Sequence, residues 1–178
     1  MSVPLVGTVV LRPLALSDAS ALATAYASNR EYLRPWEPVR TDSFFTPEGQ
    51  HEAVARSLVD VTEGRGAFWL LVDGDRVIGR ISLTDIALGA FQSANLGFWV
   101  SADHQGQGLA SAATAEVCAL AANEFGLHRI QAGTLLHNHG SQKVLDRAGF
   151  TRIGVAAAYL RIDDAWQDHI LFQRLLDD

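Results

Sequence analysis

Residues 92–111 read QSANLGFWVSADHQGQGLAS, a pattern that predicts a strand, a glycine loop and the start of a helix. Its first half, residues 92–100, has the apolar and aromatic composition of a strand, and a helix starts at about Gly108. Gly106 and Gly108 let the backbone bend and let a ligand approach without meeting a Cβ atom. Outward-pointing N–H groups at a helix start, together with the helix dipole, are typical of a phosphate or pyrophosphate site.

Three interpretations of this glycine loop compete. A P-loop needs Gly-Lys-Ser/Thr, which the loop lacks. A dinucleotide-binding loop needs an acid about 20 residues on, at the end of the next strand. That strand, residues 129–136, ends in His137-Asn138 and offers no acid. A lone glycine loop can also be a plain strand-to-helix turn, so the rest of the chain has to decide.

The rest of the chain alternates strands and helices around this loop. Periodicity, caps and turn residues predict strands at residues 8–14, 67–72, 76–85, 92–100, 129–136, 151–161 and 165–175, and helices at about 17–28, 46–63, 108–125 and 138–147. One strand–helix–strand unit therefore lies in an otherwise hairpin-connected sheet. This order predicts an α+β (mixed α/β) fold in a single domain, residues 1–178.

Composition limits the classes of function. A chain of 178 residues with 48% hydrophobic residues can bury a substantial core. The net charge of −6 argues against nucleic-acid binding, which needs clustered Lys and Arg, and leaves room for a cationic peptide end. No apolar run approaches the ~20 residues of a membrane span, and the N-terminus lacks a signal-peptide pattern, so we expect a cytoplasmic protein. No Cys/His spacing predicts a metal site.

Two motifs in register resemble those of the GNAT acetyltransferase superfamily. Residues 105–110, QGQGLA, resemble its Q/R-x-x-G-x-G/A signature, and Asn138-x-x-Ser141 followed by Ala-Gly-Phe at 148–150 resembles its second signature. The resemblance implies a central, mostly antiparallel seven-stranded sheet with a splayed parallel strand pair and flanking helices. It also implies acetyl-CoA as cosubstrate and no metal.

Further stretches narrow the resemblance to the ribosomal-protein N-terminal acetyltransferases of the RimJ/RimL type, nearest to RimJ. They are residues 29–38, 96–100 and 159–169, with His137-Asn138 and Ser141. This resemblance implies transfer of acetyl to the N-terminal α-amine of a protein. Two alternatives stay open: a small-molecule amine as acceptor, such as an antibiotic, a polyamine or an amino acid, and an acyl-CoA-binding sensor without turnover. Either a monomer or a homodimer is compatible with the sequence.

The resemblance also implies which residues bind acetyl-CoA. The strands at 92–100 and 129–136 should start paired and then splay apart around the pantetheine arm. The candidate cofactor-binding residues are Trp99, Val100 and Ser101 for the pantetheine, Gln105, Gly106, Gln107, Gly108, Leu109 and Ala110 for the pyrophosphate, and Asn138 and Ser141 near the thioester. The backbone N–H of Val100 is the expected oxyanion donor.

At two positions the chain departs from the catalytic residues of the superfamily, and this bears on the candidate catalytic groups. Many superfamily members place a tyrosine acid four residues after the position of Ser141, and here that residue is Leu145. Ser141, directly or through water, is therefore the candidate partner of the CoA sulfur. Members often carry a glutamate base on the strand before the glycine loop, where this chain has Asn95. Glu37, acting through water, is the first candidate base.

The absence of a glutamate base at Asn95 affects which kind of amine the site can use as acceptor. Deprotonating an α-amine with a pKa of about 8 costs roughly 1.4 kcal/mol at pH 7, whereas a lysine at about 10.4 costs roughly 4.6 kcal/mol. A site without a strong base therefore suits an α-amine. Asp168 and His169 follow Glu37 as candidate bases, and the competing explanation for them is a cross-strand pair on a half-exposed sheet.

Residues 29–38, NREYLRPWEP, are expected to form the acceptor wall. The two prolines predict an extended, exposed conformation, and the aromatic and acidic side chains suit a cationic peptide end. Trp36 has a competing explanation, because it can simply fill the core. The candidate substrate-binding residues are Glu31, Tyr32, Trp36, Glu37 and Asn95.

Overall fold

The computed structural model describes residues 2–176, and its centre is one eight-stranded sheet with the order β1-β2-β3-β4-β5-β6-β8-β7. The strands are β1 (Val3–Pro4), β2 (Val9–Pro13), β3 (Ala67–Asp73), β4 (Arg76–Ala87), β5 (Ser93–Val100), β6 (Arg129–Leu135), β7 (Thr151–Ile162) and β8 (Ala165–Leu175). The helices are α1 (Ala19–Ser28), α2 (Arg30–Leu33), α3 (Pro47–Thr62), α4 (Leu109–Asn123) and α5 (His139–Arg147). The mixed α/β prediction is confirmed.

The sheet has one strand more than the seven predicted. The extra strand is β1, which pairs antiparallel with β2 through Val3 opposite Leu11 and Pro4 opposite Val10. Two residues are too few to show an alternating pattern, so no sequence signal announces this strand. It adds an edge strand beside β2 and does not change the centre of the sheet.

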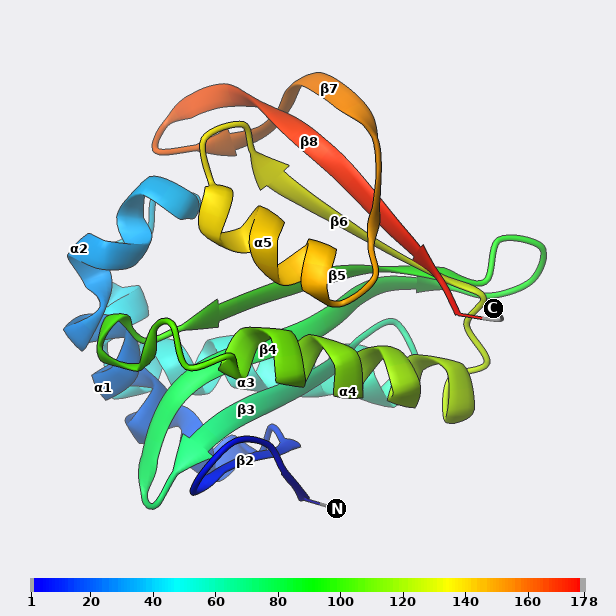
Figure 1. The fold of residues 1–178 in the computed structure, drawn as a ribbon. Coiled ribbons are helices and arrows are strands. Elements are labelled where there is room, and N and C mark those ends of the chain that lie inside the picture. Colours follow the sequence, from blue (N-terminus) through cyan, green and yellow to red (C-terminus); the bar gives the residue numbers. More distant parts are fainter. Residues whose placement is uncertain (1, 177–178) are drawn as a thin grey trace.

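Helices cover both faces of the sheet (Figure 1). Helices α4 and α5 lie on one face and α1 and α3 on the other. Strand β3 is buried between them and carries apolar side chains on both faces, whereas in β4 polar residues alternate with buried ones from Arg80 to Thr84. One apolar cluster joins α4 and α5 to the sheet through Val117 and Leu145. A second joins α1 and α3 through Leu22 and Val54.

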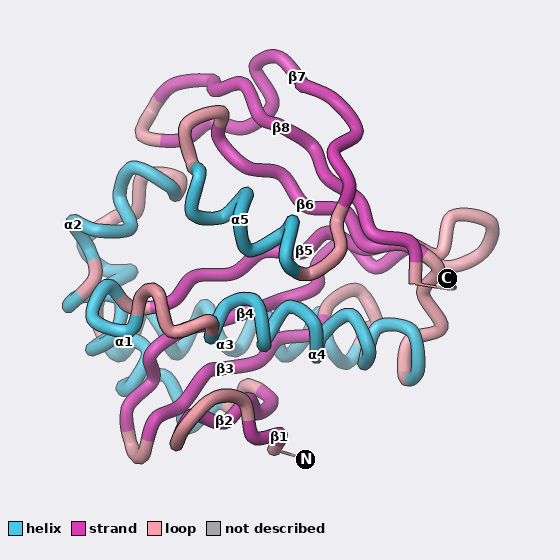
Figure 2. The backbone as a smooth tube through the Cα atoms, in the orientation of Figure 1, coloured by secondary structure: helices cyan, strands magenta, loops and turns pink. Residues whose placement is uncertain are grey.

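The parallel pair β5–β6 opens into a gap. Only three residues of each strand are paired, from Ser93 opposite Arg129 to Asn95 opposite Gln131. Beyond them β5 stays with β4 up to Val100, while β6 stays with β8 up to Leu135. Figure 2 shows the two strands side by side at their start and apart at their carboxyl ends.

The segment expected to be extended is largely helical. After α1, residues Arg30–Leu33 form α2 and Arg34–Trp36 form a 3-10 turn, so the prediction of an extended conformation was wrong for this part. Pro35 is tolerated because the first turn of a helix needs no N–H donor at that position. Only from Glu37 onward is the backbone extended. As a result α2 lies at the open end of the gap (Figure 1).

Candidate active site

A cleft with an empty volume of about 2390 Å³ reaches both faces of the sheet through the gap between β5 and β6. On the α4 side it is lined by the glycine loop and the first turns of α5. On the α1 side it is lined by the α2 segment and by the polar face of β4. The residues that line it include Tyr26, Glu37, Arg40, Arg80, Trp99, Val100, Gly108, Asn138 and Ser141.

The strand register leaves the backbone of Val100 free to face the gap. The N–H of Ser101 donates to the carbonyl of Ile78 at 2.7 Å. Along an antiparallel pair, residues that form backbone hydrogen bonds to the partner strand alternate with residues that do not. Ser101 and Trp99, which lies opposite Arg80, therefore bond to β4, and Val100 between them does not. Val100 therefore directs its N–H and carbonyl toward β6, where β5 has no partner.

The glycine loop has the geometry of an anion site. Gly106 and Gly108 have φ of 75° and 79°, and a Cβ atom at either position would meet nothing within 4 Å. The loop thus needs glycine for its backbone angles, and open space lies in front of it. At the start of α4, the backbone N–H of Ala112 donates a hydrogen bond to the carbonyl of Gly108 at 3.0 Å. The amides of the first turn therefore have no acceptor within the helix, which is the donor set that a pyrophosphate needs.

The start of α5 positions the second motif. The side-chain oxygen of Asn138 accepts from the backbone N–H of Ser141 at 3.0 Å and so caps the helix. Both residues line the cleft, and the hydroxyl of Ser141 has no hydrogen-bond partner among residues 2–176. Leu145, four residues after Ser141, is fully buried in the core.

Glu37 is a carboxylate on the α1 side of the cleft, which we name the acceptor half. Burial raises the pKa of Glu37, and the positive charges of Arg40 and Arg80 oppose this shift. Its side chain lines the cleft and also a second cavity beside α2. A carboxyl with a raised pKa is a better proton acceptor for an amine than an ordinary exposed one.

Aromatic side chains tie the two halves of the cleft together. Tyr32 of α2 accepts a hydrogen bond from the side chain of Gln105 in the glycine loop. The ring of Trp36 lies 5.5 Å from that of His137, between centroids, across the mouth of the gap. Trp36 is therefore not a core residue, and it lines the cleft.

Four of the predicted site residues do not line the cleft. Ser101 is 2% exposed and accepts a hydrogen bond from Asn29 at 3.1 Å, so it connects the start of the glycine loop to the end of α1. Asn95 donates to Asp85 at 3.0 Å on the surface. Glu31 is exposed beside Arg34, and Gln107 is exposed in the loop.

The structure brings in residues that sequence reasoning missed. Arg80, Ser82 and Thr84 line the acceptor half from the face of β4 that looks toward α1 and α3. Tyr26 of α1 accepts a hydrogen bond from the indole of Trp99 at 3.0 Å. The sequence signal for this polar face was the alternation of Arg80, Ser82 and Thr84 with buried Ile81 and Leu83. A strand that is buried on both faces is expected to be apolar throughout.

Residues 2–176 hold no group of three His, Cys, Asp or Glu side chains that could bind a metal ion. Within the same residues, no helix is both long enough and apolar enough to cross a lipid bilayer.

Comparison with known proteins places this geometry in context. Residues 8–151 match the family model described as the acetyltransferase (GNAT) domain. The chain is 34% identical over 166 residues to the probable N-acetyltransferase YjcK of Bacillus subtilis, covering 91% of each chain. It is 35% identical over 156 residues to the ribosomal protein uS5-alanine N-acetyltransferase of Escherichia coli, covering 86% of this chain and 80% of the other.

A solved structure shows the same fold. RimJ of Mycobacterium smegmatis, in complex with CoA-disulfide, superposes with a TM-score of 0.93 at 29% identity. The superposition covers 98% of this chain and 86% of the other.

Proposed function

Because the chain belongs to the GNAT acetyltransferase family, and is thus an acetyl-CoA-dependent N-acetyltransferase, we propose that its acceptor is the N-terminal α-amine of a protein. A ribosomal protein is the proposed class of acceptor, because the uS5-alanine N-acetyltransferase is among its relatives. Such an acceptor is met in the cytoplasm, where we place the enzyme. The observation that carries the proposal is the cleft that passes through the sheet between β5 and β6.

The α4 side of the cleft fits acetyl-CoA. The glycine loop offers open space and unpaired amides for the pyrophosphate. The backbone edge of Val100 in the gap can bond the pantetheine arm and can donate its N–H to the oxygen of the thioester carbonyl. Ser141 lines the same gap with a free hydroxyl, which suits a hydrogen bond to the departing sulfur.

The acceptor side holds one carboxylate for the amine. In the proposed reaction the neutral amine attacks the acetyl carbonyl, the C–N bond forms, the C–S bond breaks, and the amine loses one proton. Glu37, directly or through water, takes that proton, and Ser141 supports the departing thiolate. An α-amine needs only about 1.4 kcal/mol for deprotonation at pH 7, so a single carboxylate with a raised pKa is sufficient.

The shape of the acceptor half favours a chain over a small amine. The cleft continues past Glu37 along the α2 segment into a second cavity with an empty volume of about 670 Å³. The two cavities share Tyr26, Leu33, Glu37, Pro38 and Arg40. A free amino acid would leave this extension empty, whereas a peptide amino terminus can occupy it.

The test compares acceptors in a thiol-release assay with acetyl-CoA. We expect turnover with peptides that begin with Ala or Ser, and none with the same peptides blocked at the α-amine but carrying an internal lysine. Mass spectrometry should place the acetyl group on residue 1 of the peptide. Turnover of small amines without turnover of any peptide would refute the proposal. Acetyl-CoA that raises the melting temperature while no amine releases thiol would favour the sensor alternative.

A further inference from the structure

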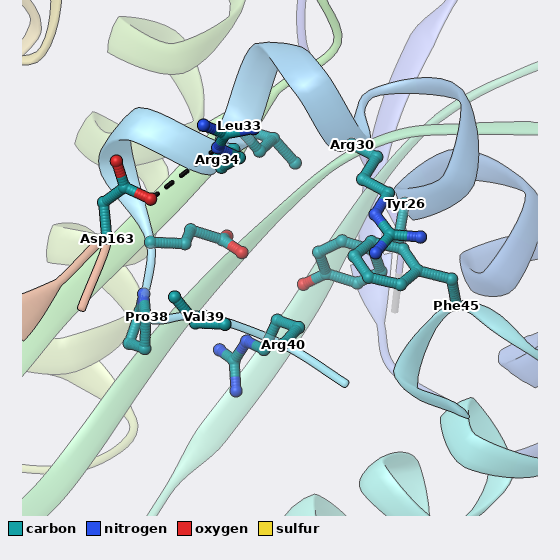
Figure 3. A pocket seen from close by; sticks show the side chains of 10 residues that line it. Tyr26, Arg30, Leu33, Arg34, Pro38, Val39, Arg40, Phe45 and Asp163 are labelled. Carbon is teal, nitrogen blue, oxygen red and sulfur yellow. Dashed lines mark ion pairs between the residues drawn. The ribbon is translucent and has the colours of Figure 1, made fainter. Parts of the chain in front are cut away.

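Two arginines without an ion-pair partner lie in the acceptor half of the cleft. Within residues 2–176, neither Arg40 nor Arg80 has a carboxylate within 4.0 Å. The other arginines near the second cavity are paired: Arg30 lies 2.6 Å from Asp42 and Arg34 lies 3.6 Å from Asp163. Figure 3 shows Arg40 and the Arg34–Asp163 pair around this cavity. Arg40 and Arg80 thus face one acid, Glu37, in a protein whose net charge is −6.

The Arg80 side chain is held in place, and it keeps hydrogen-bond donors that a ligand can use. One guanidinium N–H donates to the hydroxyl of Ser57 on α3 at 3.0 Å, and the guanidinium carbon lies 5.0 Å from the ring centroid of Phe68. Arginine has five N–H donors, so the remaining donors of this half-buried side chain can serve a ligand in the cleft. A fork fixed by a hydroxyl and an aromatic ring is preorganised for bidentate binding of a carboxylate.

The two arginines are placed for the acceptor rather than for the phosphates of CoA. Arg80 is opposite Trp99 in the β4–β5 register, and the indole of Trp99 bonds to Tyr26 on the α1 side. The glycine loop and the start of α4 lie on the other face of the sheet (Figure 1). The guanidinium of Arg40 lies 4.6 Å from the ring centroid of Phe44, also on the α1 side.

From this arrangement we infer a carboxylate subsite formed by Arg80 and Arg40, which takes an acidic side chain at the second or third residue of the acceptor peptide. The inference rests on the proposed function, because it assumes a peptide whose α-amine is at Glu37. Two residues of extended chain span roughly 7 Å, which keeps such a side chain within the same cleft. The preferred acceptors are therefore protein N-termini with Asp or Glu directly after the first residue or one residue later.

The experiment measures kcat/KM for C-terminally amidated hexapeptides that begin with Ala. One set carries Asp, Asn or Lys at position 2, another carries them at position 3, and all other residues are uncharged. We expect the wild-type enzyme to favour Asp over Asn by about tenfold at one of the two positions, and to disfavour Lys. The Asp/Asn ratio should shrink when the salt concentration rises from about 0.05 to about 0.5 M, because salt screens the ion pair.

Variants assign the preference to the arginines. R80Q should bring the Asp/Asn ratio close to one, R40Q should reduce it, and R80K should retain part of it. R80E should favour the Lys peptide over the Asp peptide. The matched control is R56Q, an exposed arginine on α3 that pairs with Glu52 at 3.9 Å and does not line the cleft; its ratio should equal that of the wild type. If R80Q does not fold, S57A removes the hydroxyl that holds Arg80 and should lower the ratio in its place.

The outcomes separate the two proposals. A wild-type ratio close to one at both positions, or a ratio that survives both R80Q and R40Q, overturns the subsite while acetylation of the peptides still supports the proposed function. A wild-type enzyme that acetylates no peptide refutes the proposed function, and the subsite with it.

Discussion

Replacing Gly108 with alanine should weaken CoA binding by an amount that its effect on stability does not explain. Gly108 has a φ of 79°, and a Cβ atom there would meet nothing within 4 Å. The fold therefore loses only the cost of a left-handed alanine, about 1–2 kcal/mol. The added methyl group, however, fills the space in front of the free amides at the start of α4, where the pyrophosphate is proposed to lie.

The size of the binding effect can be followed by thermal or chemical unfolding. At a CoA concentration of 100 Kd, a ligand stabilises a protein by about 2.7 kcal/mol. If the methyl group raises Kd about tenfold, the same CoA concentration stabilises the variant by only about 1.4 kcal/mol. Isothermal titration calorimetry measures Kd directly, and urea unfolding with and without CoA measures both free energies on the same samples.

Gly126 provides the matched control. It follows the other end of α4, has a φ of 61°, and likewise has nothing within 4 Å of an added Cβ atom. Gly126→Ala should therefore lose the same ~1–2 kcal/mol of stability but bind CoA like the wild type. If both alanine variants bind CoA equally well, the assignment of the glycine loop to the pyrophosphate is refuted.

Three further predictions concern single side chains. Ser141→Ala should lower kcat by about 10² or more while CoA affinity changes little, because the Asn138 cap uses the backbone N–H that alanine keeps; an unchanged kcat removes Ser141 from the mechanism. For Glu37→Gln, whose parent carboxyl has a pKa raised by burial, log kcat/KM should fall toward acid pH with a slope of one instead of two, since only the amine still takes up a proton; identical pH profiles contradict a base role. Asp18→Asn should cost about 1.5–3 kcal/mol at pH 7, because the fork from Arg12 at 2.7 and 2.8 Å lowers the pKa of Asp18. That stability is present above the unfolded pKa of about 3.9 and is lost as the pH falls through the lower folded value, so urea unfolding should show the two proteins converging in acid.

Local patterns in the sequence predicted the elements that depend on local physics. The helix expected at 46–63 spans Pro47–Thr62, with the side chain of Thr46 capping it through the N–H of Gly49 at 3.1 Å. The helix after the glycine loop likewise begins where Gly108 predicted it. A cap, a proline and an apolar periodicity all act within a few residues, so the sequence shows them directly.

Asn29 illustrates what the sequence could not show. It belonged to a segment predicted to be extended and exposed, yet it is 7% exposed. Its amide donates to the carbonyl of Ala25 at 2.9 Å and to Ser101 at 3.1 Å, and it accepts from the N–H of Ala102 at 3.0 Å. The last two partners are more than 70 residues away, so the conformation of this segment depends on a contact with the glycine loop. No pattern within residues 29–38 carries that information.

The acceptor half depends on long-range register, and this explains why sequence patterns indicated Glu37 as a candidate but did not indicate Tyr26 or Arg80. The proposed pyrophosphate site uses consecutive residues, whereas Tyr26, Glu37 and Arg80 line one cleft only because α1, the α2 segment and β4 pack together. Arg80 reaches the α1 side because β4 pairs it with Trp99. Since side chains alternate along a strand, a slip of one residue would turn Arg80 to the α4 side. The same residues in the same order would then still bind CoA through the glycine loop, but they would present a different wall to the amine. Acceptor specificity in this fold is therefore encoded in strand register and in the packing of α1 and α2, and a signature motif that spans six residues carries none of it.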